Sequence, residues 1–218
     1  MAMKLERNRD MTDSQPAAAL VLAGGKSSRM KTNKAFLPLE GSLLIERIIA
    51  QLKPRFSEIL LCVTKEKQYD FLGFPQVVDD NPFQGPLGAI LSGLRASKNR
   101  VNFAIACDIP EINPELMTHM FAFTESYDIV VPTTGFGMHE PLFAFYNTNT
   151  IPFIENLLAE RQRRLSLLFS LCRTCYVPMD DTSWYFNLNT VEDLKRYQYY
   201  SAMKKRRPSS TERPQMSL

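Results

Sequence analysis

A glycine pair followed by basic residues comes directly after the first apolar segment of the chain. Gly24 and Gly25 follow that segment, and Arg29 and Lys34 come next. Adjacent glycines let the backbone approach a ligand closely and turn its N–H groups toward an anion. Arginine and lysine supply fixed positive charge for phosphate oxygens. We therefore expect this segment to bind phosphate groups.

Two common phosphate-binding patterns do not fit this segment. A Walker A loop ending at Gly25-Lys26-Ser27 would need its first glycine where Leu20 stands, and the third glycine of a dinucleotide fingerprint is missing. A tight turn carrying solvated cations is the remaining alternative.

Carboxylates and amides follow later apolar segments. Asp108 comes directly after one, where it could hold Mg²⁺ against a nucleotide phosphate or simply cap a turn. Asp79-Asp80 could read a base edge, help to bind a metal, or form a turn. Asn187 and Asn189 stand at the expected end of a last strand, where their side chains could bind a heterocycle or stabilise a turn.

The elements that must position these residues alternate between strand and helix. This alternation predicts an α/β fold, one three-layer domain whose mostly parallel sheet is covered by helices on both faces. In such sheets ligands bind beyond the carboxyl ends of the strands, where the polar residues above stand. Expected strands are residues 17–22, 59–63, 76–78, 101–106, 128–131, 142–146 and one ending at 187–190; expected helices are residues 43–52, 85–96, 114–123, 154–159, 165–171 and 190–200.

Composition places the chain among ordinary globular proteins. It has 218 residues, 44% hydrophobic and 22% charged, which is enough to bury a core in one domain. We expect that domain over residues 16–202, with flexible tails at 1–15 and 203–218. The net charge of +3 is concentrated in the C-terminal tail, so we expect no nucleic-acid partner. No apolar run could span a membrane and no signal peptide is recognisable, so we expect a cytoplasmic protein.

Four cysteines and two histidines complete the set of reactive side chains. Cys172 and Cys175 form a CxxC, but a zinc site would need a second pair of ligands. Buried thiols in a reducing compartment are the simpler interpretation. His139 precedes Glu140 and Pro141 and has no nucleophile at a recognisable spacing, so acyl transfer has little support.

Taken in order, the motifs resemble the molybdenum cofactor guanylyltransferase family, often called MobA, among the nucleotidyltransferases built on a Rossmann-like sheet. The resemblance runs over residues 17–197. It rests on residues 22–30 (LAGGKSSRM) with Lys34, 78–80 (VDD), 85–87 (GPL), 107–110 (CDIP), 139–142 (HEPL) and 187–190 (NLNT).

The resemblance implies transfer of GMP from GTP to the phosphate of molybdenum-carrying molybdopterin, with release of pyrophosphate. It implies Mg²⁺ as cofactor and Arg29, Lys34 and Asp108 as catalytic residues. By the same resemblance, Leu22, Ala23, Gly24 and Gly25 embrace the GTP, Arg29 and Lys34 meet its phosphates, Asp80 contacts the nucleoside, Asp108 holds Mg²⁺, and Gly85, Pro86, Leu87, Asn187 and Asn189 line the molybdopterin side. Implied protein partners are molybdenum cofactor biosynthesis proteins and acceptor molybdoenzymes.

Other functions remain open on the same motifs. Cys62 stands where guanylyltransferases of this family often place an asparagine near guanine. A cytidylyltransferase of the same cofactor family, or another small-molecule nucleotidyltransferase, is therefore an alternative. A catalytically degenerate nucleotide-binding protein is a second alternative, and RNA binding through the basic tail is a third.

Overall fold

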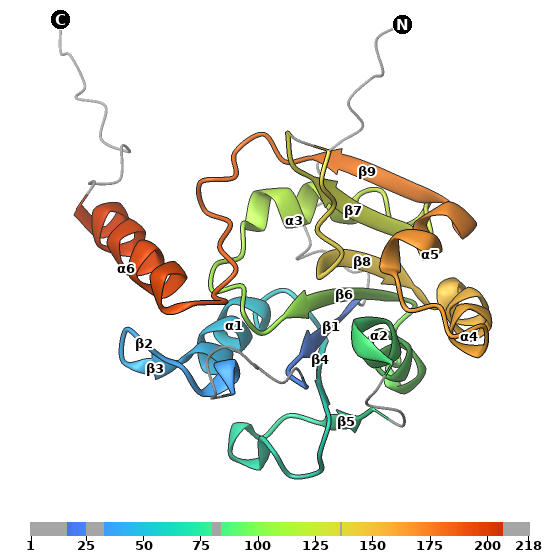
Figure 1. The fold of residues 1–218 in the computed structure, drawn as a ribbon, viewed down its shortest axis with the longest axis horizontal. Coiled ribbons are helices and arrows are strands. Elements are labelled where there is room, and N and C mark those ends of the chain that lie inside the picture. Colours follow the sequence, from blue (N-terminus) through green and yellow to red (C-terminus); the bar gives the residue numbers. More distant parts are fainter. Residues whose placement is uncertain (1–16, 25–32, 80–83, 136, 207–218) are drawn as a thin grey trace, which may run out of the picture.

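The protein folds around a seven-stranded sheet with the order β5-β4-β1-β6-β8-β7-β9 (Figure 1). The computed structural model describes residues 17–24, 33–79, 84–135 and 137–206. Within these residues β8 runs antiparallel to both of its neighbours, and the other strand pairs of the sheet are parallel. The strands are β1 (Ala17–Leu22), β4 (Glu58–Val63), β5 (Gln76–Val78), β6 (Val101–Ala106), β7 (Ile129–Thr133), β8 (Phe143–Asn147) and β9 (Thr174–Pro178).

Helices cover both faces of the sheet and divide the core into two layers. Alternate residues of β1 point to opposite faces, so Ala19 and Val21 join one layer while Leu20 and Leu22 join the other. The first layer contains buried residues of α1 (Leu44–Leu52), α3 (Pro114–Phe121) and α6 (Val191–Arg206). The second contains buried residues of α2 (Gly85–Ala96), α4 (Ile151–Ala159) and α5 (Leu165–Leu171). The expected three-layer α/β fold is thus confirmed.

The helix boundaries follow local capping. The Asn113 side chain accepts a hydrogen bond from the Leu116 N–H at 3.0 Å, and Pro114 occupies the first helical position of α3. At the start of α6, Thr190 Oγ1 accepts from the Asp193 N–H, and Asp193 Oδ2 accepts from the Thr190 N–H at 2.9 Å. This is the reciprocal capping box expected from the sequence, with aspartate in the usual place of glutamate.

Three features differ from the sequence-based expectation. The last strand is β9, Thr174–Pro178, and residues 187–190 lie in a loop rather than at the end of a strand. A small hairpin of β2 (Pro38–Leu39) and β3 (Ser42–Leu43), turning at Glu40 and Gly41 with positive φ, was not expected. Helix α6 continues past Tyr200 to Arg206, so a domain boundary at residue 202 would fall inside a helix. In the part of the chain that the structure describes, no helix has the length and apolar character needed to cross a membrane.

Helix α2 packs so closely on the sheet that Gly93 has no room for a side chain. A Cβ at this position would lie 2.9 Å from Cys62 Sγ and 2.9 Å from Leu20 Cδ1. We expect Gly93→Ala to lower the free energy of unfolding by about 1–3 kcal/mol through overpacking, as measured by urea denaturation. Gly135→Ala is the matched control, because a Cβ there has no described atom within 4 Å. Equal stability of the two variants would contradict this account of the packing.

Candidate active site at the carboxyl edge of the sheet

The carboxyl ends of four parallel strands form one edge of the sheet. In the order β5-β4-β1-β6, the residues just beyond these ends are Asp79, Thr64, Gly24 and Asp108. Each segment is tied to its neighbour by the backbone. The Asp79 N–H donates to the Val63 carbonyl at 2.9 Å, and the Cys107 N–H donates to the Leu22 carbonyl at 3.2 Å. Three of these residues, Asp79, Gly24 and Asp108, were singled out from the sequence, and they lie along this edge in that order.

The end of β1 is held tightly by its neighbours. The Ala23 N–H donates to the Cys62 carbonyl at 2.9 Å, and the Ala23 carbonyl accepts from the Tyr69 hydroxyl at 3.1 Å. Leu22 and Ala23 bury their side chains in the core. A Cβ at Gly24 would lie 2.9 Å from Thr64 Cγ2 and 3.3 Å from the Thr64 backbone nitrogen, so a side chain at this position would force the end of β4 to shift. These residues fix where Gly24 leaves the sheet.

Tyr69 links the two ends of the glycine-containing segment. Its fully buried hydroxyl donates to the Ala23 carbonyl and accepts from Asn33 Nδ2 at 2.9 Å. Burial raises the pKa of Tyr69 to about 12, so the hydroxyl keeps its proton. Asn33 also caps the short 3-10 helix Lys34–Phe36 by accepting from the Ala35 N–H at 3.1 Å. The position of Lys34 is thereby tied to the end of β1, a role for Tyr69 that no sequence motif indicated.

Lys34, Asp108 and Asn189 converge from distant parts of the chain. The Lys34 ammonium donates to Asp108 Oδ2 at 3.0 Å and also to Asn189 Oδ1. The Lys34 and Asp108 side chains are 15% and 20% exposed, so the pair is partly shielded but still open to a ligand. Asn189 is held by its backbone N–H, which donates to Asp193 Oδ2 at 3.0 Å. The capping box of α6, not the end of a strand, thus presents Asn189 to this cluster.

The cluster of Lys34, Asp108 and Asn189 contains oxygen atoms that could act as Mg²⁺ ligands. A carboxylate oxygen and an amide oxygen converge on one cationic group, and both are the hard oxygen ligands that Mg²⁺ prefers. Among the residues that the structure describes, no group of three or more His, Cys, Asp or Glu side chains could hold a metal. Mg²⁺ is commonly held by one or two carboxylates together with substrate phosphates, so Asp108 fits such a site.

A second set of polar groups adjoins the cluster. Asn187 is exposed, and its Nδ2 lies 3.5 Å from the Tyr185 hydroxyl, which donates to Glu140 Oε2 at 2.8 Å. Burial raises the pKa of Glu140, and the Tyr185 hydrogen bond partly offsets that effect. Between the two asparagines, buried Leu188 donates its N–H to the Asp108 carbonyl at 2.9 Å. Tyr185 and Glu140 were not selected from the sequence, although Glu140 stands within the quoted 139–142 motif.

The start of α2 lies beside the end of β5. A Cβ at Gly88 would come within 3.4 Å of Asp79 Oδ2, which places the first turn of α2 next to Asp79. Gly85 adopts φ +67°, a left-handed conformation that favours glycine. Gly85 and Pro86 are exposed, whereas Leu87 is fully buried in the core. This turn therefore lies on the same edge as Asp108, with β4 and β1 between their strands.

Cys62 and the Cys172–Cys175 pair contribute no thiol to the cluster of Lys34, Asp108 and Asn189. Cys62 is 1% exposed and lies under Gly93, and burial raises the pKa of its thiol to about 12. Its side chain therefore cannot touch a bound base. Cys172 and Cys175 are free, half-buried thiols, and burial raises the pKa of both. Gly25, Arg29 and Asp80, the other expected site residues, lie outside the described residues.

A protein-family model and two proteins of similar sequence point to the same family for this chain. Residues 19–173 match the model of the MobA-like NTP transferase domain. A probable molybdenum cofactor guanylyltransferase from Peptoclostridium acidaminophilum is 32% identical over 194 residues, covering 83% of this chain and 87% of that protein. A second from Carboxydothermus hydrogenoformans is 38% identical over 151 residues, covering 69% of this chain and 76% of that protein.

A solved structure shares the fold. Molybdopterin-guanine dinucleotide biosynthesis protein A from Archaeoglobus fulgidus aligns with a TM-score of 0.74 at 24% identity. The alignment covers 85% of this chain and 99% of that one. Asn187, Asn189 and α6 lie beyond the end of the matched domain model, so the part of the site that they contribute is not covered by that model.

Proposed function

The chain belongs to the MobA-like NTP transferase family, and from this premise we infer that it is a molybdenum cofactor guanylyltransferase. In the proposed reaction a terminal phosphate oxygen of molybdenum-carrying molybdopterin attacks the α-phosphorus of GTP. The bond between the α- and β-phosphates breaks, GMP is joined to the acceptor, and pyrophosphate leaves. The attacking phosphate is already ionised near pH 7, so the reaction needs no general base.

The observation that carries this proposal is the convergence of Lys34, Asp108 and Asn189. Two polyanions must be held in line, and their mutual repulsion must be offset in a partly shielded site. In this proposal Lys34 leaves the Asp108 carboxylate when GTP enters and donates to a phosphate oxygen instead. Asp108 would hold Mg²⁺, which when bound neutralises the charge that develops on the phosphates. Arg29 would add a second cation, and Gly24 and Gly25 would bring backbone N–H groups close to the triphosphate.

The remaining residues divide between the nucleoside and the acceptor. We assign Leu22 and Ala23 to the GTP side through the backbone that they fix, and Asp80 to the nucleoside. Asn187 and Asn189, with the exposed turn at Gly85 and Pro86, are assigned to molybdopterin, and the fully buried Leu87 supports that turn from the core. Asn187 is exposed, and Asn189 already contacts Lys34. Such a placement would bring the acceptor phosphate to the nucleotide over Asp108.

The proposed setting follows from the same assignment. The product would pass to acceptor molybdoenzymes, with or without help from other proteins of molybdenum cofactor biosynthesis. We propose the cytoplasm as the compartment in which this occurs.

A thermal-shift comparison of GTP, CTP and ATP, each with Mg²⁺, tests the nucleotide assignment. At a concentration about 100 times its dissociation constant, a ligand adds about 2.7 kcal/mol of stability, which raises the melting temperature by several degrees. We expect that shift with GTP and a much smaller one with CTP or ATP. A larger shift with CTP would contradict the guanylyl assignment in favour of a cytidylyltransferase. Binding of GTP without pyrophosphate release in the presence of acceptor would indicate a degenerate nucleotide-binding protein.

A further inference from the structure

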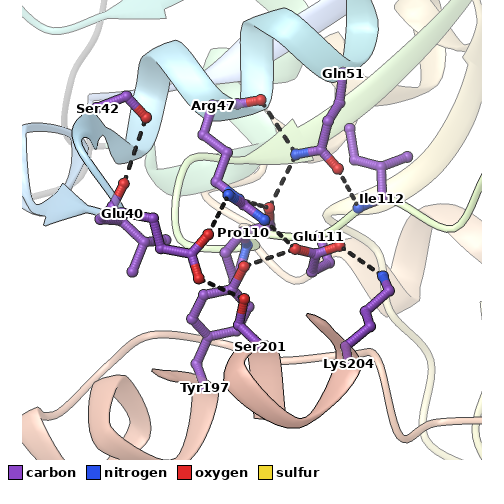
Figure 2. Close-up of polar contacts among 11 residues, drawn as sticks. Glu40, Ser42, Arg47, Gln51, Pro110, Glu111, Ile112, Tyr197, Ser201 and Lys204 are labelled. Atoms are coloured by element: carbon purple, nitrogen blue, oxygen red, sulfur yellow. Dashed lines mark hydrogen bonds and ion pairs between the residues drawn. The ribbon is translucent and has the colours of Figure 1, made fainter. Parts of the chain in front are cut away.

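A dense polar network joins residues 110–112, which follow Asp108 in the chain, to helices α1 and α6 (Figure 2). Side chains of helix α1 form hydrogen bonds with the backbone of residues 110–112. The Pro110 carbonyl accepts from Arg47 Nε at 3.3 Å and from Gln51 Nε2 at 2.9 Å. The Ile112 N–H donates to Gln51 Oε1 at 3.0 Å. Helix α1 thus fixes the path of this segment.

The carboxylate of Glu111 joins this segment to two helices. It accepts from Arg47 of α1, from the Tyr197 hydroxyl of α6 at 2.6 Å, and from Lys204 Nζ of α6 at 3.3 Å. The Glu111 side chain is 13% exposed. Burial alone would raise the pKa of Glu111, but the hydrogen bonds from Tyr197 and Arg47 outweigh it and lower that pKa. The carboxylate is therefore charged near neutral pH, and it accepts hydrogen bonds from all three of these donors.

A second carboxylate ties the same two helices together. Glu40, in the turn between β2 and β3, accepts from Arg47 Nη1 at 3.1 Å and from the Ser201 hydroxyl of α6. The two carboxylates and the two cations, Arg47 and Lys204, balance in charge. A balanced and hydrogen-bonded network of this kind favours one arrangement of its members over others.

Hydrogen bonds link the segment from Asp108 to Glu111 with the loop before α6 and with α6 itself. The Asp108 carbonyl accepts a hydrogen bond from the Leu188 N–H, and the Asn189 N–H donates to the Asp193 carboxylate in the first turn of α6. One turn later, Tyr197 of the same helix is bonded to Glu111, three residues after Asp108. Two contacts thus fix the position of Asn189 relative to Asp108. One is the hydrogen bond from Leu188 to the Asp108 carbonyl, and the other is the hydrogen bond from Tyr197 of α6 to Glu111.

We propose that Glu111 is a positioning residue that holds the Asn187–Asn189 segment against Asp108 by anchoring α6. It touches neither Lys34 nor the two asparagines among its described contacts, so it acts through α6. The catalytic consequence rests on the proposed function, in which Asn189 meets the acceptor. Because a displacement of about 1 Å can cost as much as 100-fold in rate, loosening α6 would weaken the acceptor step.

The kinetic test compares Glu111→Gln with Glu155→Gln. Glu155 makes the same kind of ion pair, with Arg95, but is 43% exposed and belongs to α4. We expect Glu111→Gln to raise the KM for the molybdopterin acceptor about tenfold, with the KM for GTP changed less than about twofold. Glu155→Gln should behave as the wild type. Equal kinetics of the two variants would overturn the proposal.

A double-mutant cycle separates positioning from general destabilisation. If Glu111 acts through the two asparagines, adding Glu111→Gln to a variant carrying both Asn187→Ala and Asn189→Ala should cause little further loss, since both positioned groups are already absent. Losses that multiply would overturn the proposal, because a merely structural defect acts independently of the two asparagines. An Asn189→Ala variant with wild-type kinetics would instead contradict the acceptor assignment made under the proposed function.

Fluorescence gives a readout that does not depend on activity. The chain has one tryptophan, Trp184, which is 6% exposed and packs on Phe143 and Tyr185 shortly before Asn187. We expect Glu111→Gln to increase acrylamide quenching of Trp184 at least twofold in folded protein, and Glu155→Gln to leave it unchanged. Unchanged quenching in both variants would overturn the proposal even if the enzyme proved inactive with molybdopterin.

Discussion

Asp108→Ala is expected to lower pyrophosphate release from GTP in the presence of acceptor by about 100- to 1,000-fold. The Asp108 carboxylate is the group proposed to hold Mg²⁺, and it also orients the Lys34 ammonium at 3.0 Å. Its removal takes away both the metal ligand and the partner of Lys34. Turnover should be followed by a coupled pyrophosphate assay over a range of Mg²⁺ concentrations. The same variant should lose the dependence on Mg²⁺, which distinguishes a metal ligand from a residue that only shapes the site.

The matched control is Asp128→Ala. Asp128 also pairs with a cation, Arg173, at 3.0 Å, but it precedes β7 and therefore lies at the opposite edge of the sheet. We expect this variant to retain wild-type turnover. Circular dichroism should show that both variants are folded. Mg²⁺-dependent turnover in folded Asp108→Ala within a factor of two of the wild type would remove the proposed mechanism.

Lys34→Met is expected to lower kcat/KM for GTP by about 10- to 150-fold. The methionine keeps the length of the apolar stem but removes the ammonium, so a phosphate loses a charge-assisted hydrogen bond of about 1.5–3 kcal/mol. The measurement is initial-rate kinetics at varied GTP and saturating acceptor.

Lys98→Met serves as its control, because Lys98 is exposed and lies just before β6 at the opposite edge of the sheet. A loss in Lys98→Met as large as that in Lys34→Met would point to a general electrostatic effect. In that case Lys34 would have no specific place in the site.

The fold could be predicted where the pattern is local. Buried strand β1 is a continuous apolar run, and β6 is an apolar run interrupted only by Asn102. Helix α3 begins at an asparagine followed by proline, so both kinds of element have local signals. Strand β9 has no such run. It is the outermost strand of the sheet, next to β7, and its residues Thr174, Cys175 and Tyr176 are partly or largely exposed. The hairpin turn places Glu40, which is not a typical turn residue, at φ 51°.

The candidate site could be predicted only in part, for a related reason. Asp108 follows from the rule that ligands bind beyond the carboxyl ends of parallel strands. Asn189 was selected for the wrong structural reason, since a helix cap and not a strand end presents it. Tyr69 and Glu111 were missed because their partners are 46 and 86 positions away along the chain. Pairings at such separations depend on the packing of whole elements and have no local sequence signal.

The most direct measurement is identification of the product formed by the wild-type chain. The protein would be incubated with Mg²⁺, molybdenum-carrying molybdopterin and an equimolar mixture of GTP and CTP, followed by mass spectrometry and quantification of pyrophosphate. We expect the guanine dinucleotide form of the cofactor, with one pyrophosphate released per product. The cytosine dinucleotide as the main product, or no dinucleotide despite bound GTP, would contradict the assignment.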